Sequence, residues 1–257
     1  MVILSTYKVI CLPGTVDYVI SELTQKFPSV KIDSKDRSSV TFISEKESLE
    51  SFRSLYSPIK IVDEGGKEIN LSRREWRKGF IPAGINPSLA YIMCMIAEFS
   101  PDDILLDPFC GSSVIPISAL KYFNIKRVIC SDISSKAIFQ SKINFENANI
   151  EMERYKLFKS DVAKVSLSKK NIDRIVSNLP FGIRTGNHEG NINLYSELEN
   201  LADRLLRTRG KLVLLTQEKN LLRNFFRKDK WNVKSVVTVD QGGLKPDIFL
   251  ITRRVIS

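Results

Sequence analysis

Histidine, paired cysteines and long apolar runs are scarce in this 257-residue sequence. The single histidine is His188, and the four cysteines show no C-x-x-C spacing. Zinc sites, disulfide frameworks and His-dependent triads are therefore disfavoured, and we expect no metal cofactor. No apolar run reaches the roughly 20 residues that a membrane span needs. The first residues read as a strand, without a basic leader or a cleavage site, so we expect a cytoplasmic protein with no membrane partner.

Acidic residues are also in short supply relative to basic ones. The chain has 39 Lys and Arg against 29 Asp and Glu, with a formal net charge of +10 and a pI near 9.4. Such a field attracts polyanions, which makes nucleic acid the favoured partner. Charge alone does not separate RNA from DNA, and a protein that is basic for other reasons stays open. The 43% apolar content is ample for a sizeable core.

Residues 1–66 predict a small α+β module, which is followed by a basic segment. The module reads as strand, helix, strand, strand, helix, strand, with strand runs at YKVICL, SSVTFIS and IKIVDE. Residues 67–100 are expected to form a linker and a helix that begins at Pro87. The linker is either a solvated charged face with a packed Trp76 or an RNA-contacting strap. In the second case the phosphate contacts are Arg73, Arg74 and Arg77.

Strands and helices alternate over residues 101–257, as a parallel sheet requires. The strand runs are DDILLD, KRVICSD, RYKLFKSD, NIDRIVSN and GKLVLLTQ. Two further runs, NVKSVVTVD and DIFLITRR, are separated only by QGGLKP, so we expect an antiparallel hairpin. This is the outline of the α/β, Rossmann-like sheet of class I methyltransferases. A dinucleotide-binding fold is disfavoured, because it needs a G-x-G-x-x-G turn and another helix.

Three successive strand ends carry the residues of a predicted S-adenosylmethionine site, because a doubly wound sheet binds ligands at its carboxyl edge. The first end reads DPFCGSS, where Gly111 lets the backbone approach the ligand. At the second, Asp132 can accept hydrogen bonds from ribose hydroxyls, and Ile133 follows. At the third, Asp161 can accept from an adenine amine, and Val162 follows. Either acid alone could instead cap a helix.

The fourth strand end, NLPFG, predicts the reactive turn. An exocyclic base amine is a poor nucleophile until its two hydrogens are held. The side-chain oxygen of Asn178 and the carbonyl of Leu179 can accept them, Pro180 stiffens the turn, and Phe181 can stack on the base. Arg184 is expected beside a phosphate that flanks the target nucleotide. A generic turn with a buried phenylalanine is the alternative.

These motifs resemble the THUMP-associated tRNA guanine-N2 methyltransferases, a group of RNA amino-methyltransferases with D-P-F-C-G-S-G and N/D-P/L-P-F/Y turns. The resemblance extends from about Arg73 through Thr216 and includes RREWRKGFIPAGINPSLA. It implies that residues 67–100, the linker and its helix, close over the methionine end of the cofactor. It implies that the methionine part of the cofactor contacts Asp107, Phe109 and Gly111. It also implies ribose contact by Asp132, adenine contact by Asp161, and a target amine held by Asn178 to Phe181.

The N-terminal module is similar to the ferredoxin-like lead-in of the same family. A complete THUMP domain should follow it, but there is little chain between IVDEGG and RREWRKG. The THUMP part is therefore expected to be truncated, and an RNA-binding partner subunit could replace it. The cofactor turn also differs, since Ser113 replaces a second glycine and Ser118 replaces a common glutamate.

The resemblance implies an S-adenosylmethionine-dependent RNA methyltransferase that acts on an exocyclic base amine, with guanine N2 of tRNA as the leading target. Other enzyme classes with a related turn are DNA adenine-N6 or cytosine-N4 methyltransferases and protein glutamine methyltransferases. A non-catalytic RNA-binding member of the fold is a third alternative, which the two serine replacements keep open.

Overall fold

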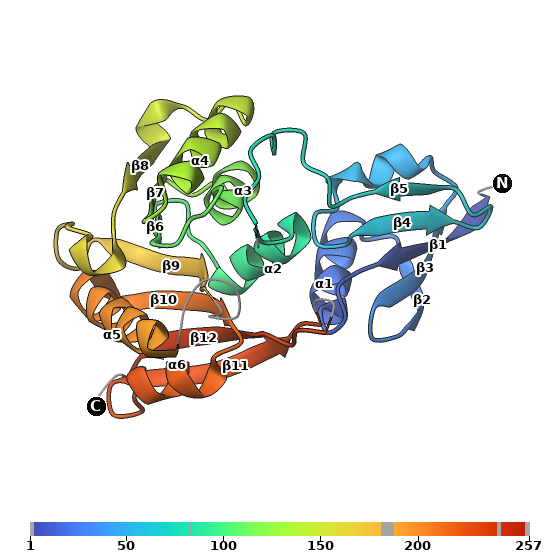
Figure 1. Ribbon diagram of the computed structural model, residues 1–257. Coiled ribbons are helices and arrows are strands. Elements are labelled where there is room, and N and C mark those ends of the chain that lie inside the picture. Colours follow the sequence, from blue (N-terminus) through green and yellow to red (C-terminus); the bar gives the residue numbers. More distant parts are fainter. Residues whose placement is uncertain (1–2, 83, 181–187, 241–242, 255–257) are drawn as a thin grey trace.

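The computed structural model describes residues 3–82, 84–180, 188–240 and 243–254. These residues form a five-stranded sheet near the N-terminus and a seven-stranded sheet that follows it. Figure 1 shows the two sheets side by side, with helix α2 and the segment before it between them. No helix within these ranges is long and apolar enough to cross a membrane.

The first sheet has the ferredoxin-like arrangement expected from the sequence. Its strand order is β2-β3-β1-β4-β5, and every neighbouring pair is antiparallel. A short 3-10 helix stands where a helix was predicted over Glu47 to Leu55, and β5 extends the sheet past the expected boundary at residue 66. The elements are β1 (Leu4–Ile10), α1 (Val16–Lys26), β2 (Lys31–Lys35), β3 (Ser39–Glu45), η1 (Leu49–Ser54), β4 (Lys60–Asp63) and β5 (Glu68–Asn70).

The elements of the second part alternate as predicted up to the last two strands. Its helices are α2 (Pro87–Ala97), α3 (Val114–Tyr122), α4 (Ser135–Asn147), η2 (Met152–Arg154), η3 (Val162–Lys164), α5 (His188–Leu205) and α6 (Lys219–Phe225). Its strands are β6 (Ile104–Asp107), β7 (Arg127–Asp132), β8 (Tyr155–Lys159), β9 (Ile172–Asn178), β10 (Leu206–Thr216), β11 (Trp231–Thr238) and β12 (Asp247–Arg253).

The strand order of the second sheet is β11-β12-β10-β9-β6-β7-β8, which confirms the predicted class I methyltransferase sheet. The five strands from β10 to β8 run parallel, whereas β12 is antiparallel to both β10 and β11. The predicted terminal hairpin is therefore confirmed. One boundary was wrong: the helix expected to reach Thr208 ends at Leu205, and β10 begins directly after it.

Both faces of the central strands β6, β7 and β9 are buried, which explains their continuous apolar runs. Successive residues of a strand point to opposite faces. Leu105 thus belongs to the core under α2 and α3, whereas Leu106 belongs to the core under α5 and α6. The sheet is rigid on both sides, so its carboxyl edge is a firm base for a site.

Arg74 joins the two sheets and does not face solvent. It is only 7% exposed, and its guanidinium donates to the carbonyls of Leu71 and, at 2.8 Å, Tyr56. The same group lies 5.1 Å from the ring centroid of Tyr56 and 5.8 Å from that of Tyr122. The prediction that Arg74 contacts RNA is therefore wrong, because its cation is enclosed by carbonyls and aromatic rings at the joint between the sheets.

Arg74→Ala should destabilise the protein. Loss of hydrogen bonds from a buried charged group is expected to lower the free energy of unfolding by about 2–4 kcal/mol and Tm by roughly 5–10 °C. Arg73→Ala, at the exposed neighbouring position, should stay within about 0.5 kcal/mol of the parent. Thermal and denaturant unfolding provide the measurement. An unchanged Tm for Arg74→Ala combined with weaker RNA binding would contradict the structural role.

Candidate functional site

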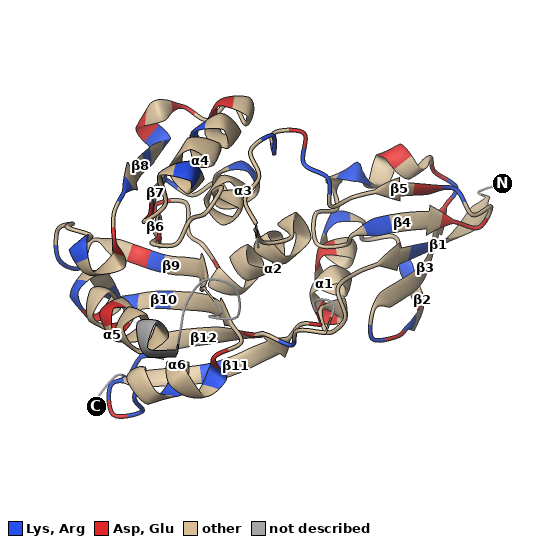
Figure 2. Ribbon diagram, in the orientation of Figure 1, with Lys and Arg blue, Asp and Glu red and all other residues tan. Residues whose placement is uncertain are grey.

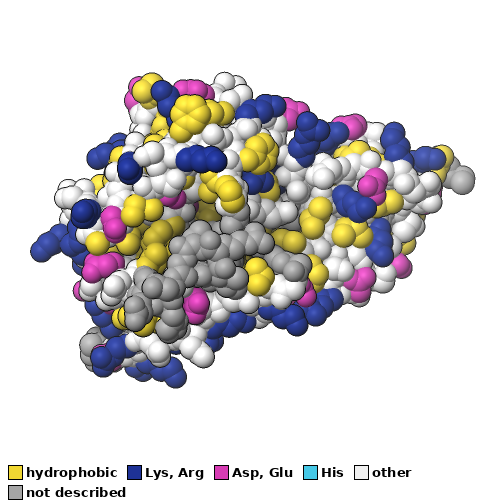
Figure 3. Space-filling model, viewed as in Figure 1, with side chains coloured by type: hydrophobic (Ala, Val, Ile, Leu, Met, Phe, Trp, Pro, Cys, Tyr) yellow, Lys and Arg dark blue, Asp and Glu magenta, His cyan; other side chains and the backbone are white. Residues whose placement is uncertain are grey.

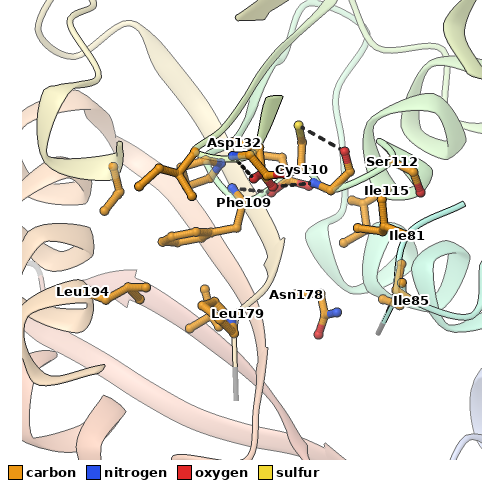
Figure 4. Close-up of a pocket in the computed structure, with 18 of the residues that line it drawn as sticks. Ile81, Ile85, Phe109, Cys110, Ser112, Ile115, Asp132, Asn178, Leu179 and Leu194 are labelled. Atoms are coloured by element: carbon orange, nitrogen blue, oxygen red, sulfur yellow. Dashed lines mark hydrogen bonds between the residues drawn. The ribbon is translucent and has the colours of Figure 1, made fainter. Parts of the chain in front are cut away.

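The carboxyl ends of β6 to β9 open into a cavity of about 840 Å³ (Figure 4). The parallel strands end at one edge of the sheet, which brings together residues far apart in the sequence. All seven predicted cofactor residues line this cavity: Asp107, Phe109, Gly111, Asp132, Ile133, Asp161 and Val162. Three residues of the predicted reactive turn also line it: Asn178, Leu179 and Pro180. Phe181 and Arg184 lie outside the described residues.

The turn after β6 has the tight left-handed backbone that its glycine permits. Gly111 has a φ of 55°, and an added Cβ would lie 2.6 Å from the Cδ1 atom of Ile81. Ser113 also has a positive φ, 59°, which is unfavourable for a serine. Its hydroxyl lies 2.8 Å from that of Ser141, which in turn donates to the Gly111 carbonyl at 2.7 Å. A hydroxyl pair thus holds the turn in the shape that a second glycine would give.

Ser118, which replaces the glutamate common in the resembled family, does not line the cavity. Its side chain is fully buried in α3, where the hydroxyl donates to the Val114 carbonyl at 2.7 Å. A hydroxyl bonded to its own helix leaves no unsatisfied group. The serine at this position therefore affects the packing of α3 and not the wall of the site.

Asp107 is an unpaired acid at the base of the cavity, with 1% of its surface exposed. Its Oδ1 atom accepts from the Ser177 hydroxyl at 2.6 Å and from the Phe109 amide at 3.2 Å. Burial raises the pKa of this carboxyl from 3.8 to about 7, although the two hydrogen bonds oppose the rise. A cation placed beside Asp107 would reverse the rise, because it favours the charged carboxylate.

Asp132 and Asp161 each stand at a turn and keep acceptor capacity for a ligand. Asp132 accepts from the amides of Gly111 and Ser134, both at 2.9 Å, and so ties two strand ends together. Asp161 accepts from the Ala163 amide at 3.0 Å and caps η3. A carboxylate has about four lone-pair sites, so each can accept more hydrogen bonds. Helix capping was the alternative to ligand binding for these two acids. Each does accept a hydrogen bond from a turn amide, and each also lines the cavity.

Asn178, the last residue of β9, carries one of two buried side-chain oxygens of the cavity wall that lack a hydrogen-bond partner within the described ranges; the other is the Ser112 hydroxyl. The Asn178 Oδ1 atom is buried and has no hydrogen-bond partner among the described residues. The next amide, that of Leu179, donates to the Leu215 carbonyl at 3.0 Å, which anchors the turn to β10. A buried acceptor without a donor costs about 1–3 kcal/mol, so a donor from a ligand is the natural partner. Figure 4 shows the Asn178 side chain in the open part of the cavity.

Residues 71–82 and 84–86, here called the strap, cross one side of the cavity. The amide oxygen of Asn144 in α4 accepts from Lys78 and Gly79 at 2.9 and 2.7 Å. Its amide nitrogen donates to Gly79 at 3.0 Å and to Ser112, in the turn after β6, at 2.8 Å. The strap is therefore fastened to α4 and to the cofactor turn at once. Its cavity-lining residues are Ile81, Pro82, Gly84 and Ile85.

Several cavity residues were not predicted from the sequence. The missed ones include Val114, Ile115, Asn193, Leu194, Glu197, Leu215 and Leu244. Ile81, Pro82 and Ile85 belong to the segment that was expected to close over the cofactor. The supporting residues Ser141 and Asn144 were missed as well. A signal for the last two existed, because both are polar, both are fully buried, and they are three residues apart on one face of α4. Polar side chains on a buried helical face need hydrogen-bond partners, because a buried polar group without one is unfavourable.

The three described arginines that were predicted to contact RNA differ in their exposure to solvent. Arg73 is exposed, whereas Arg74 is buried at the joint between the sheets. Arg77 is half-buried and lies with its guanidinium 5.0 Å from the ring centroid of Phe80. Within the part of the chain that the structure describes, no group of three or more His, Cys, Asp or Glu could hold a metal ion.

Comparison with known proteins places this site in a family. Residues 74–247 match UPF0020, an RMKL-like methyltransferase domain. The chain is 25% identical over 228 residues to a Methanocaldococcus jannaschii protein named tRNA (guanine(6)-N2)-methyltransferase, in a match that covers 74% of this chain and 59% of that relative. It therefore spans less than two thirds of that protein's length.

Two solved structures share the fold of the whole chain. TrmN from Thermus thermophilus has a TM-score of 0.81 at 18% identity, covering 97% of this chain and 100% of TrmN. SMU.472, solved in complex with SAH, has a TM-score of 0.74 at 13% identity over 100% of both chains. The family match covers more than half of the sequence and includes every strand end that lines the cavity. The chain therefore belongs to the UPF0020 family of RMKL-like methyltransferase domains.

Proposed function

We propose that this chain is an S-adenosylmethionine-dependent RNA methyltransferase whose target is guanine N2, in tRNA. The observation that carries the proposal is the buried Oδ1 atom of Asn178, which has no hydrogen-bond partner among residues 3–82, 84–180, 188–240 and 243–254 and lies in the same cavity as the three acids of the proposed cofactor site. An amine donor is the partner that this atom lacks. The printed name of the Methanocaldococcus jannaschii relative supports guanine N2 and tRNA.

The cavity wall fits the proposed cofactor. Asp107 would face the ammonium of the methionine part beneath the strap, and Asp132 would accept from the ribose hydroxyls. Asp161 would accept from the adenine amine. Ile133, which is 64% exposed at the cavity, supplies an apolar surface for a base. S-adenosylmethionine supplies an activated methyl group on a sulfonium, and the solved complex of SMU.472 with SAH supports a cofactor of this kind.

The reactive turn would make the target amine nucleophilic by holding its hydrogens. The Asn178 Oδ1 atom and the Leu179 carbonyl would each accept one N–H of the exocyclic amine. Directing both hydrogens at fixed acceptors leaves the nitrogen lone pair directed away from them. Phe181 is proposed to stack on the extruded base, and Arg184 to contact a flanking phosphate, as the family resemblance implies.

The remaining parts of the proposal concern the rest of the chain. We propose a division into residues 1–66, 67–100 and 101–257, with the first part and an RNA-binding partner subunit acting in place of a full THUMP domain. The net charge of +10 supports an anionic substrate. Figure 2 shows Lys and Arg distributed over both sheets. A cytoplasmic location is part of the same proposal.

Labelled methyl transfer distinguishes the enzyme classes. Purified protein should transfer label from S-adenosylmethionine to tRNA, and nuclease digestion should release N2-methylguanosine. Ribosomal RNA, duplex DNA and protein are the competing substrates in the same assay. Label in N6-methyladenine, N4-methylcytosine or methylglutamine would replace the proposed target by one of the other enzyme classes. Cofactor binding without transfer to any substrate would favour a non-catalytic member.

Asp132→Ala should weaken cofactor binding while leaving RNA binding within twofold. Removal of a charged acceptor for ribose costs roughly 1.5–3 kcal/mol, which is about one to two decades in affinity. Asp102→Ala removes an exposed carboxylate outside the cavity and serves as the control. Calorimetry gives the cofactor affinity and filter binding gives the RNA affinity. Equal losses of both affinities would indicate a folding defect instead.

Cofactor affinity should rise with pH and level off above about 7, because burial holds the pKa of free Asp107 at about 7. A bound ammonium lowers this pKa, so the complex carries fewer protons than the free protein. Affinity for S-adenosylhomocysteine should therefore fall by up to about tenfold per pH unit below that point. Calorimetry in buffers of different ionisation enthalpy should detect the released proton. Asp107→Asn should abolish the release; proton release that persists would place the titrating group elsewhere.

Asn178→Ala should slow the chemical step with little effect on binding. Because the amine is held most strongly as methyl transfer proceeds, the single-turnover rate should fall by at least about 100-fold, with cofactor and RNA affinities within a few-fold. Asn147→Ala, at an exposed position of α4, is the matched control. Full activity of Asn178→Ala on authentic substrate would leave this turn with a structural role only.

A further inference from the structure

Two phenylalanines are largely exposed on two segments that contact each other, one in the strap and one in α4. Phe80 of the strap is 58% exposed and Phe139 of α4 is 61% exposed, and they are the only phenylalanines among the described residues with large exposure. Exposed aromatic rings forgo the free energy of burial, about 25 cal/mol per Å² of apolar area. Aromatic side chains left in water at one place mark a surface that binds something.

The structure holds these two rings at fixed positions. The Phe80 amide donates to Gln140 Oε1 at 3.1 Å, and Gln140 directly follows Phe139 in α4. Gly79 is pressed against the same residue, since an added Cβ would lie 2.4 Å from the Gln140 carbonyl oxygen. The residue after Phe80 is Ile81, which lines the cavity. Phe80 therefore directly precedes a cavity residue, and the helix that carries Phe139 is fastened to the same segment through Gln140.

Cations accompany both rings. Lys136 and Lys142 are exposed and flank Phe139 at a spacing of three residues, which places all three on one side of α4. The guanidinium of Arg77 lies 5.0 Å from the centroid of the Phe80 ring. Figure 3 shows hydrophobic and basic side chains together over α4 and the strap.

These charges are available to an anion. Lys136 forms no ion pair within the described ranges, and Lys142 approaches Glu146 only at 3.9 Å, with both side chains well exposed. An exposed pair of this kind contributes little free energy. Phe80, Lys136, Phe139 and Lys142 are called the aromatic–basic surface below.

We propose that the aromatic–basic surface binds the unpaired nucleotides that flank the target guanosine in the RNA substrate. Bases stack on Phe80 and Phe139, and the phosphates between them contact Lys136 and Lys142. This inference rests on the proposed function and adds a second contact region outside the cavity. Alternation of aromatic rings and cations is how proteins bind single-stranded nucleic acid.

The surface would also help the reaction. Extrusion of a base from its stack costs a few kcal/mol, and new stacking partners for its neighbours offset part of that cost. Because Phe80 belongs to the strap, stacking on it would couple RNA binding to the segment that covers one side of the cavity.

A protein partner is the competing occupant of this region. A groove of about 470 Å³ lies beside Phe139, lined in part by Ile138, Met152 and Leu157. Met152 is 77% exposed. We favour RNA because cations flank the ring at the groove's edge, whereas a groove built for an apolar protein segment needs no such cations.

The test uses the full chain and tRNA carrying the target guanosine. Phe139→Ala and Phe80→Ala should each raise the RNA Kd by roughly five- to 100-fold, as expected for loss of one stacked base. Phe139→Tyr should retain most of the affinity, but Phe139→Leu should not, because leucine keeps apolar area and lacks a stacking face. Lys136→Ala should lower the salt slope of binding by about one unit or slightly less. Cofactor affinity should be unchanged in all four Phe139 and Lys136 variants.

Ile32→Ala serves as a control, since it removes an exposed apolar side chain from β2 of the other sheet. RNA affinities within twofold of the parent for both Phe80→Ala and Phe139→Ala would overturn the inference. Equal retention of RNA affinity by Phe139→Leu and Phe139→Tyr would also overturn it, because binding would then need no aromatic stacking face. If the parent protein forms no N2-methylguanosine in tRNA, the proposed function itself fails. That result is distinct from a loss of RNA affinity in the variants.

Discussion

The hydrogen bonds of the Asn144 side-chain amide are the interactions on which the site depends most directly. Asn144 is fully buried and makes four hydrogen bonds, three to the strap and one to the turn after β6. Strap and turn have no regular secondary structure of their own, so their backbone groups need partners from elsewhere. One asparagine in α4 supplies several of them, and it thereby fixes the position of the strap relative to the turn after β6.

A second constraint comes from the parallel sheet. Its strands end at one edge, and each end contributes a polar group that is only partly satisfied by the fold. Asp107 has an elevated pKa because it is buried without a counter-ion, and the Oδ1 atom of Asn178 has no donor among the described residues. Unsatisfied groups of this kind are unfavourable for stability. Their concentration at one edge is a sign of ligand binding, since a bound cation and a bound amine would relieve both.

The sequence predicted most of this arrangement, because the determining signals are local. The missing helix before the last strand and the acids at the strand ends follow from short segments, and the predicted class I methyltransferase sheet with its terminal hairpin was correct. Arg74 shows where such reasoning fails. It stands among Arg73, Arg77 and Lys78 and reads as one more surface cation. Only the packing of the two sheets reveals that carbonyls and the rings of Tyr56 and Tyr122 enclose it.

The sequence by itself determined the fold class, the terminal hairpin and the residues at the four strand ends, since periodicity and turn chemistry are properties of neighbouring residues. The tertiary structure alone decided which side chains close the cavity, why Ser113 can occupy a left-handed position, and that the segments carrying Phe80 and Phe139 contact each other. Each of these facts depends on contacts between segments distant in the chain, such as Ser113 with Ser141 and Phe80 with Gln140. No local pattern encodes those pairings, because they arise only when the strap, α3 and α4 pack around the same edge of the sheet.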